Sequence, residues 1–383
     1  MKKVLVLISI FSVSFLCQIR GTLNPGMYML YQHFSDYPTS TVSLMINICS
    51  LAVIPTSYII GKLTGRIITY KKVIIGMNIF LIVGGVGPFF VENLYMMLIF
   101  RLLFGVGIGI AIALHKSLIL EYYSGKKQIK YLGYATIVAS IGTIFFQTII
   151  SFLGKIYWKL MFFGYLPIVI TLLFSFFLPD ISLNKPQIKN QKEKISSNVM
   201  IILGIFLVLN MTMTAVSVNQ SSLFSEKGFE NAIVLAASVG NVNAIFSVLS
   251  GFVFDKIYQR FKDSFIVIAM ICSLCGILVY ILGKNEISMY FAAAIFGFFY
   301  NFVVLYLFLI ADNCCQLKNK AVIGGYMAVV AGIGGFLATA LIHICEMFFY
   351  ESIYSVFIIG AVVLMIGTIV VFYVLKSNNI STD

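Results

Sequence analysis

The chain has 383 residues, of which 60% are hydrophobic and only 10% are charged. A soluble protein usually has about 25% charged residues, so water cannot be the main solvent of this one. Apolar runs of about 20 residues recur from end to end, and each is long enough to cross a bilayer as a helix. The composition therefore excludes a soluble globular protein and predicts an all-α membrane protein.

The net charge of +12 would indicate nucleic-acid binding if the basic residues formed one patch. They form many small groups instead. Most of these groups lie in every second loop between the apolar runs, which is the same side of the membrane each time. Few fall in the opposite loops, namely Lys155, Lys159, Lys227 and Lys284. The positive-inside rule therefore places both termini in the cytoplasm, and no nucleic-acid partner is expected.

Apolar length, interrupting charges and turn residues predict twelve spans. The first six are expected near residues 4–32, 41–63, 72–90, 94–118, 131–152 and 159–178. The other six are expected near residues 199–220, 231–252, 264–283, 287–310, 322–345 and 353–375. Residues 179–197 are rich in Lys, Asn and Gln and are expected to form a cytoplasmic linker. The predicted domains are thus a six-helix bundle at 1–178 and another at 198–383.

An internal repeat relates the two halves. Residues 61–66 (GKLTGR) are echoed by residues 251–256 (GFVFDK), and each copy follows an even-numbered span. A second echo pairs residues 133–134 with residues 325–326, which both read Gly-Tyr. Two related six-helix halves are the plan of many secondary transporters, whose substrate site lies at the interface of the halves near mid-membrane.

The residues of this repeat resemble a loop signature of the major facilitator superfamily. Gly61 and Arg66 fit that signature, although Gly65 stands where the family usually has Asp. Asp255 keeps the acid in the second copy. In the fourth span, Arg101 followed by glycines at 105, 107 and 109 resembles another motif of the family.

The resemblance covers nearly the whole chain. It implies the fold of that family, with twelve transmembrane helices in two pseudo-symmetric bundles. It also implies transport by alternating access, in a bacterial cytoplasmic membrane, and the likeness is greatest to efflux-type members. The Gly-Pro element that drug antiporters of the family carry in the fifth span is absent from residues 131–152.

Three cations fall inside predicted spans, where an ionised side chain costs about 3 kcal/mol on insertion scales. Arg20 is expected to face the central cavity and to hold a carboxylate or phosphate, with snorkelling or a structural bond to backbone carbonyls as the alternative. The nearby Asn24-Pro25-Gly26 is expected to bend or open the first helix. Lys116 is a second candidate for the substrate, unless it snorkels to the surface. For Arg101 the resemblance implies coupling, and the alternative is a brace between closely packed helices.

Glu121 and Asp312 occupy near-equivalent places in the repeat, beside the basic loops that contain Arg66 and Lys256. We expect ion pairs there that close the cytoplasmic side and break when it opens. The alternative is that both acids are solvated helix ends. The complete set expected in coupling or gating is Arg101, Gly61, Arg66, Glu121, Gly251, Asp255, Lys256 and Asp312.

Polar uncharged side chains gather in the seventh, eighth and tenth spans. We expect them to line the cavity from the second half, with interhelical hydrogen bonds as the alternative. Together with the cations they give the expected substrate-binding set of Arg20, Asn24, Lys116, Asn210, Asn241, Tyr300 and Asn301.

The predicted function is secondary active transport of a small organic solute, with export as the expected direction. Uptake of a small organic anion by symport is the alternative, with a proton or sodium as the coupling ion. A membrane sensor or scaffold is a third reading. No H-E-x-x-H, nucleophile elbow or P-loop occurs, so an enzyme, a cofactor and a metal site are not expected. The expected partners are the lipid bilayer and the solute, and the chain is expected to be a monomer.

Overall fold

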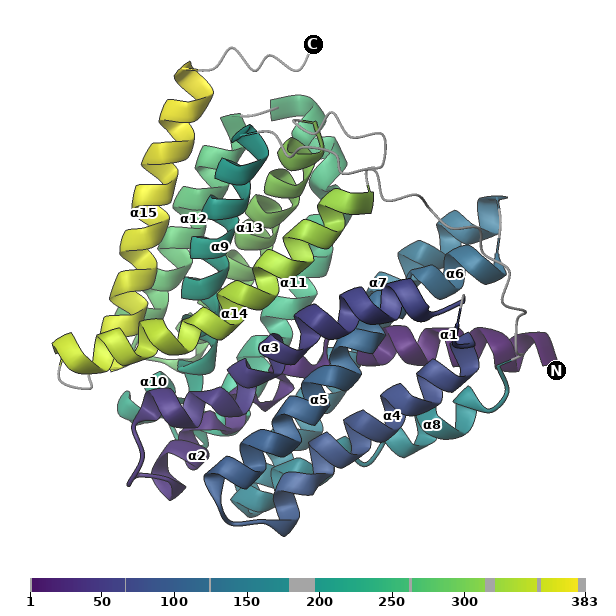
Figure 1. Ribbon diagram of the computed structural model, residues 1–383. Coiled ribbons are helices and arrows are strands. Elements are labelled where there is room, and N and C mark those ends of the chain that lie inside the picture. Colours follow the sequence, from purple (N-terminus) through teal and green to yellow (C-terminus); the bar gives the residue numbers. More distant parts are fainter. Residues whose placement is uncertain are drawn as a thin grey trace. The chain divides into compact units, whose positions relative to one another are not determined.

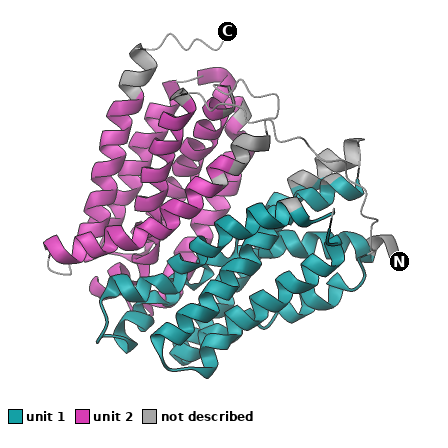
Figure 2. Ribbon diagram, viewed as in Figure 1, with its two compact units in different colours: residues 1–191 teal, residues 192–383 magenta. Residues whose placement is uncertain are grey.

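The computed structural model describes residues 2–65, 67–123, 125–178, 197–261, 264–313, 321–349 and 353–377. Within these residues the regular elements are helices, apart from one isolated bridge between Thr64 and Ile68. The predicted all-α class is confirmed. The chain divides into two compact units, residues 1–191 and residues 192–383 (Figure 2).

Unit 1 holds the helices of the first half (Figure 1). They are α1 (Lys2–Leu16), the 3-10 helix η1 (Ile19–Gly26), α2 (Met27–His33), α3 (Thr39–Leu63), α4 (Tyr70–Val86), η2 (Gly87–Phe90), α5 (Leu94–Leu114), α6 (Ser117–Tyr122), α7 (Gly125–Ile156), η3 (Trp158–Tyr165) and α8 (Ile168–Ser175). Within this unit α5 packs against both α3 and α4, and α7 packs against α1, η1 and η3.

Unit 2 holds the helices of the second half, of which α9, α12, α13 and α15 run side by side in Figure 1. They are α9 (Ser197–Val218), α10 (Gln220–Glu226), α11 (Ala232–Phe261), α12 (Ser264–Leu282), α13 (Glu286–Asn313), α14 (Ala321–Phe349) and α15 (Ile353–Ser377). Here α13 packs against both α11 and α12, and α9 packs against α14 and α15.

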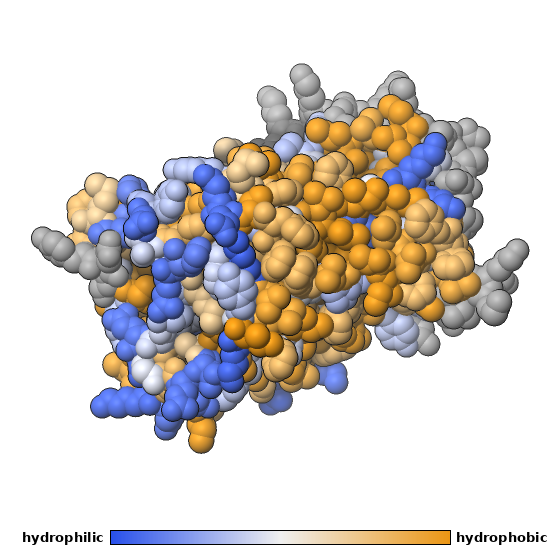
Figure 3. All heavy atoms as spheres, turned by 90° about the horizontal axis from the view of Figure 1, so that it is seen from below, coloured by the Kyte–Doolittle hydropathy of each residue, from blue (hydrophilic) through white to orange (hydrophobic). Residues whose placement is uncertain are grey.

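The described helices supply the predicted spans. Eleven segments are long and apolar enough to cross a membrane, and a bent pair, Leu5–Leu16 with Ile19–His33, makes up to twelve. The face of the molecule in Figure 3 carries a broad hydrophobic area. Helices suit this setting because they satisfy their backbone hydrogen bonds internally, where lipid offers none.

The first span is a broken helix. α1 ends at Leu16, Cys17 and Gln18 form a turn, and η1 follows at an angle of 46° between the two halves. Pro25 lies inside η1, and its missing N–H opposes a continuous α-helix. The sequence thus locates the irregular segment at residues 24–26, but the break itself begins earlier, at Cys17.

The same close helix contact occurs in both units. A Cβ atom on Gly105 of α5 would overlap the backbone carbonyl of Cys49 in α3, and one on Gly297 of α13 would overlap that of Asn243 in α11. The two glycines are 297 − 105 = 192 residues apart, close to the spacing of the sequence repeat. The duplication read from the sequence therefore extends to the packing of the helices.

The two copies of the repeat end differently. In the first copy α3 ends at Leu63, and Gly65 has a φ of 78°, a left-handed conformation that glycine adopts without strain. Asp255 stands at the equivalent position of the second copy, and there α11 continues to Phe261. The part of α11 that could cross a membrane nevertheless ends at Phe254, close to the expected end of the eighth span near residue 252. The first copy thus turns at a glycine in the left-handed conformation, and the second copy has no glycine at that position.

Candidate functional site

Arg20 lies in η1, directly after the break in the first span. Its Nη1 donates a hydrogen bond to Oγ of Ser50 in α3, and the residue is half-buried. A guanidinium carries five N–H donors. The bond to Ser50 therefore leaves most of the Arg20 donors available for a further acceptor.

Arg101 in α5 is fully buried. Its Nε donates to the Met45 carbonyl at 2.7 Å, and Cys49 Sγ donates to the Arg101 carbonyl at 3.1 Å. The guanidinium carbon lies 4.4 Å from the centre of the Phe104 ring and 5.6 Å from that of Tyr165. Neither terminal nitrogen has a hydrogen-bond acceptor among the described residues. The bonds to α3 match a brace between helices, but the guanidinium retains unused donors.

The fourth predicted span contains a local irregularity, although Leu94–Ile119 still forms one candidate span. α5 ends at Leu114, and His115 and Lys116 separate it from α6. Lys116 is exposed and lies near Cys17, at the break of the first span. This irregularity therefore lies near the break of the first span.

Arg20, Arg101 and Lys116 share a setting without paired acids among the described residues. Arg20 and Arg101 both lie near Cys49, and in the described part of the chain neither they nor Lys116 form an ion pair with a carboxylate. Buried charges are normally paired. This region of unit 1 is therefore electropositive and chemically suited to an anion.

A polar stripe on α3, which sequence reasoning missed, faces this region. Ser40, Ser43, Asn47 and Ser50 follow at spacings of three or four residues and are all buried. Residues with such spacings share one face of a helix. The occurrence of this polar stripe in an otherwise apolar span is the signal that could have identified Ser50 as a partner of Arg20.

Contacts with other elements of unit 1 also hold η1 in place. Thr22 Oγ1 lies 3.1 Å from the Tyr165 hydroxyl of η3, and a Cβ on Gly142 of α7 would overlap the carbonyl of Phe15, at the end of α1. Asn24 lies within η1, and its carbonyl accepts a bond from the N–H of Met27. The segment that carries Arg20 and Asn24 is thus positioned by contacts with α3, α7 and η3.

The polar residues expected from the second half are Asn210 in α9, Asn241 in α11, and Tyr300 and Asn301 in α13. Asn301 Nδ2 donates to the Ser247 carbonyl of α11 at 2.8 Å, which matches the alternative of an interhelical bond. The Tyr300 ring stacks on Phe296 with ring centres 5.0 Å apart. Within the described residues, the Tyr300 hydroxyl and Asn210 Oδ1 have no hydrogen-bond partner.

The expected inner ion pairs stay a prediction. Arg66 lies outside the described residues, and so do the side chains of Asp255 and Asp312. Glu121 Oε2 lies 3.5 Å from the Tyr70 hydroxyl, a long distance for a hydrogen bond. Lys256 is exposed on α11.

The paired glycines of the expected gates lie in open surroundings. A Cβ atom on Gly61 or on Gly251 would meet nothing within 4 Å. Neither glycine is therefore needed for close helix packing in this structure.

Comparison with known proteins identifies the family. The sequence profile of the Major Facilitator Superfamily matches residues 6–339. The chain belongs to this superfamily. No curated protein matches the chain significantly.

Solved structures of major facilitator transporters share the fold. The nucleoside transporter NupG has 14% identity, with a TM-score of 0.80 for a mutant structure and 0.76 for a second structure, each covering 96% of this chain and 99% of that one. A bacterial homologue of the human lysosomal transporter Spinster, in an inward-facing and occupied conformation, has 14% identity and a TM-score of 0.73, covering 98% and 97%. Membership of this superfamily and the candidate spans make the protein a multi-pass membrane transporter and not an enzyme.

Proposed function

We propose that this protein is a secondary transporter whose substrate is a small organic anion bound at Arg20. The observation that supports the proposal is the half-buried Arg20 guanidinium, which bonds Ser50 and has no carboxylate partner among the described residues. A guanidinium binds carboxylate or phosphate through two parallel hydrogen bonds. An anionic solute would therefore supply the acceptors that the chain does not.

Nearby charge strengthens this proposal. Arg101 adds a second buried positive charge near Cys49, and Lys116 lies near Cys17 at the break of the first span. At an effective dielectric constant of about 20, two opposite unit charges about 10 Å apart attract by roughly 1–2 kcal/mol. Even a cation that never touches the solute can therefore favour an anion.

The broken first span is suited to a moving substrate site. Transporters of this type bind solutes at discontinuous helices and then expose the site alternately to the two sides. The turn at Cys17 and the 3-10 segment that follows provide such a discontinuity beside Arg20. Export remains the predicted direction, with a proton or sodium as the candidate coupling ion.

An uncharged polar solute is a second candidate. It is favoured by the Tyr300 hydroxyl and Asn210 Oδ1, which lack hydrogen-bond partners within the described residues of unit 2. One protein of similar fold is a nucleoside transporter, which is consistent with this candidate.

A thermal-shift screen of the purified protein distinguishes the two candidates. The panel pairs carboxylates and phosphate esters with their uncharged amide or alcohol analogues. A ligand at a concentration of about 100 times its Kd stabilises by about 2.7 kcal/mol. We expect a rise in Tm for an anion and none for its uncharged analogue.

The Arg20 variants then locate the binding site. Arg20→Gln should abolish the anion-dependent rise in Tm, whereas Arg20→Lys keeps the charge and should retain part of it. Ser247→Ala in unit 2 is the control and should retain all of it. An equal response of the wild type and Arg20→Gln would reject the proposed role of Arg20, and a response to uncharged analogues alone would favour the second candidate.

A further inference from the structure

A separate pocket of unit 1 lies away from the cations at the helix breaks. It has a volume of about 370 Å³ and is lined by Met29, Gln32, His33, Gly154, Lys155, Ile156, Tyr157 and Trp158. Its walls come from α2, from the last turn of α7 and from the start of η3. The volume lies within the range of about 300–1,000 Å³ that is usual for ligand sites.

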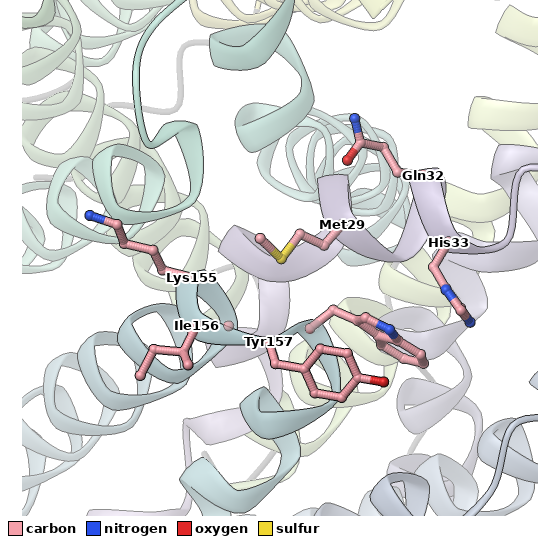
Figure 4. Close-up of a pocket in the computed structure, with 8 residues that line it drawn as sticks. Met29, Gln32, His33, Lys155, Ile156 and Tyr157 are labelled. Carbon is pink, nitrogen blue, oxygen red and sulfur yellow. The ribbon is translucent and has the colours of Figure 1, made fainter.

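The pocket is amphipathic. In Figure 4, Met29 and Tyr157 lie near the centre of the labelled side chains, while the Lys155 ammonium and the His33 ring lie toward the edges. His33 stacks on Trp158 with ring centres 4.1 Å apart. The lining therefore combines an apolar and aromatic centre with a polar rim.

The charge of the pocket is positive. Lys155 is exposed and forms no ion pair within the described part of the chain. The neighbouring Lys159 is different, because its ammonium lies 3.0 Å from a Glu92 carboxylate oxygen. No acidic residue lines the pocket, so Lys155 is its unneutralised charge.

The pocket lies at the level of a membrane surface. Two candidate spans, Ile19–His33 and Tyr134–Ile156, end at it, and a third, Trp158–Ser175, begins there. The distribution of basic residues predicts that this is the outer side. Ile156 is 64% exposed and Tyr157 is 50% exposed, so the apolar part of the pocket continues into the surface that lipid would cover.

We propose that this pocket binds the headgroup of an anionic phospholipid. Lys155, whose side chain lies at the edge of the pocket in Figure 4, would turn its ammonium to the phosphate, and Gln32 and His33 would offer polar atoms to the headgroup. Met29 and Ile156 would contact the first carbons of the glycerol and acyl chains. Free phosphate would leave this apolar wall without a partner, and therefore a lipid fits the lining better than a soluble anion.

The protein contains its own reporter for this site. Trp158 is the single tryptophan of the chain and lines the pocket, so selectively excited tryptophan fluorescence reports events there. The full-length protein in neutral detergent is titrated with short-chain phosphatidylglycerol, and in parallel with short-chain phosphatidylcholine and inorganic phosphate. We expect a saturable change of emission with phosphatidylglycerol at concentrations where the other two have little effect.

Variants of Lys155 connect this response to the pocket. A basic residue at a membrane surface contributes about 1 kcal/mol to the binding of anionic lipid, so Lys155→Gln should weaken the titration about fivefold. Lys155→Arg keeps the charge and should restore it. Lys284→Gln removes another exposed lysine, from the loop between α12 and α13 of unit 2, and should leave the titration unchanged.

Four results would overturn the proposal. They are the absence of a saturable change, equal titrations with phosphatidylglycerol and phosphatidylcholine, an unaltered titration of Lys155→Gln, and a full response to inorganic phosphate alone. The second would mean that the aromatic residues act only as a membrane anchor, and the last would mean that the site takes a soluble anion.

Discussion

Two arginines inside spans of one unit occupy different surroundings. Arg20 is half-buried and bonds a single hydroxyl, whereas Arg101 is fully buried and bonds backbone of α3. The sequence identifies both, because a charge in an apolar run is conspicuous. It does not distinguish their roles, since accessibility depends on the helices that pack around each residue.

Arg101→Met tests whether the buried guanidinium serves stability or the substrate. A buried donor without an acceptor costs about 1–3 kcal/mol, and methionine still fills the space. We therefore expect an unchanged or higher Tm for this variant, with the affinity for the anion reduced about tenfold because a positive charge is lost. A clearly lower Tm with unchanged affinity, measured by the same thermal titration, would assign Arg101 the role of a brace alone.

At the scale of elements, irregular segments at α1–η1 and α5–α6 carry the candidate residues Arg20 and Lys116. Hydropathy predicts each of these as one span, because a short turn such as Cys17-Gln18 or His115-Lys116 does not make the sequence polar. Ser50, the partner of Arg20, is likewise not predicted from hydropathy, although the polar stripe of α3 indicates it. The turn at Gly65 and the helix through Asp255 show that the helices of two diverged copies of a repeat can end at different points.

The approach of α7 to the end of α1 can be tested at Gly142. A Cβ atom there would overlap the Phe15 carbonyl, so Gly142→Ala should cost about 1–3 kcal/mol of stability through overpacking. Gly76→Ala in α4 is the control, because its Cβ atom would meet nothing within 4 Å. We expect a lower Tm for Gly142→Ala and an unchanged or higher Tm for Gly76→Ala. Equal shifts of Tm in both variants would contradict the close contact.

At the scale of the whole molecule, the duplication is visible in both the sequence and the helix packing. The spans and the family follow from apolar length and from the repeat, and the structure reproduces them with Gly105 and Gly297 at equivalent contacts. The substrate does not follow from the same features. A cation is visible in the sequence, but the absence of a carboxylate beside it among the described residues is a property of the fold.

Counterflow in proteoliposomes tests the central proposal most directly. Vesicles containing the purified protein are loaded with an excess of the unlabelled anion found in the thermal screen, and the entry of the labelled anion is followed. The proposal predicts transient accumulation by the wild type, partial accumulation by Arg20→Lys and none by Arg20→Gln, with no counterflow of the uncharged analogue. Equal counterflow of the uncharged analogue by the wild type and Arg20→Gln would contradict it.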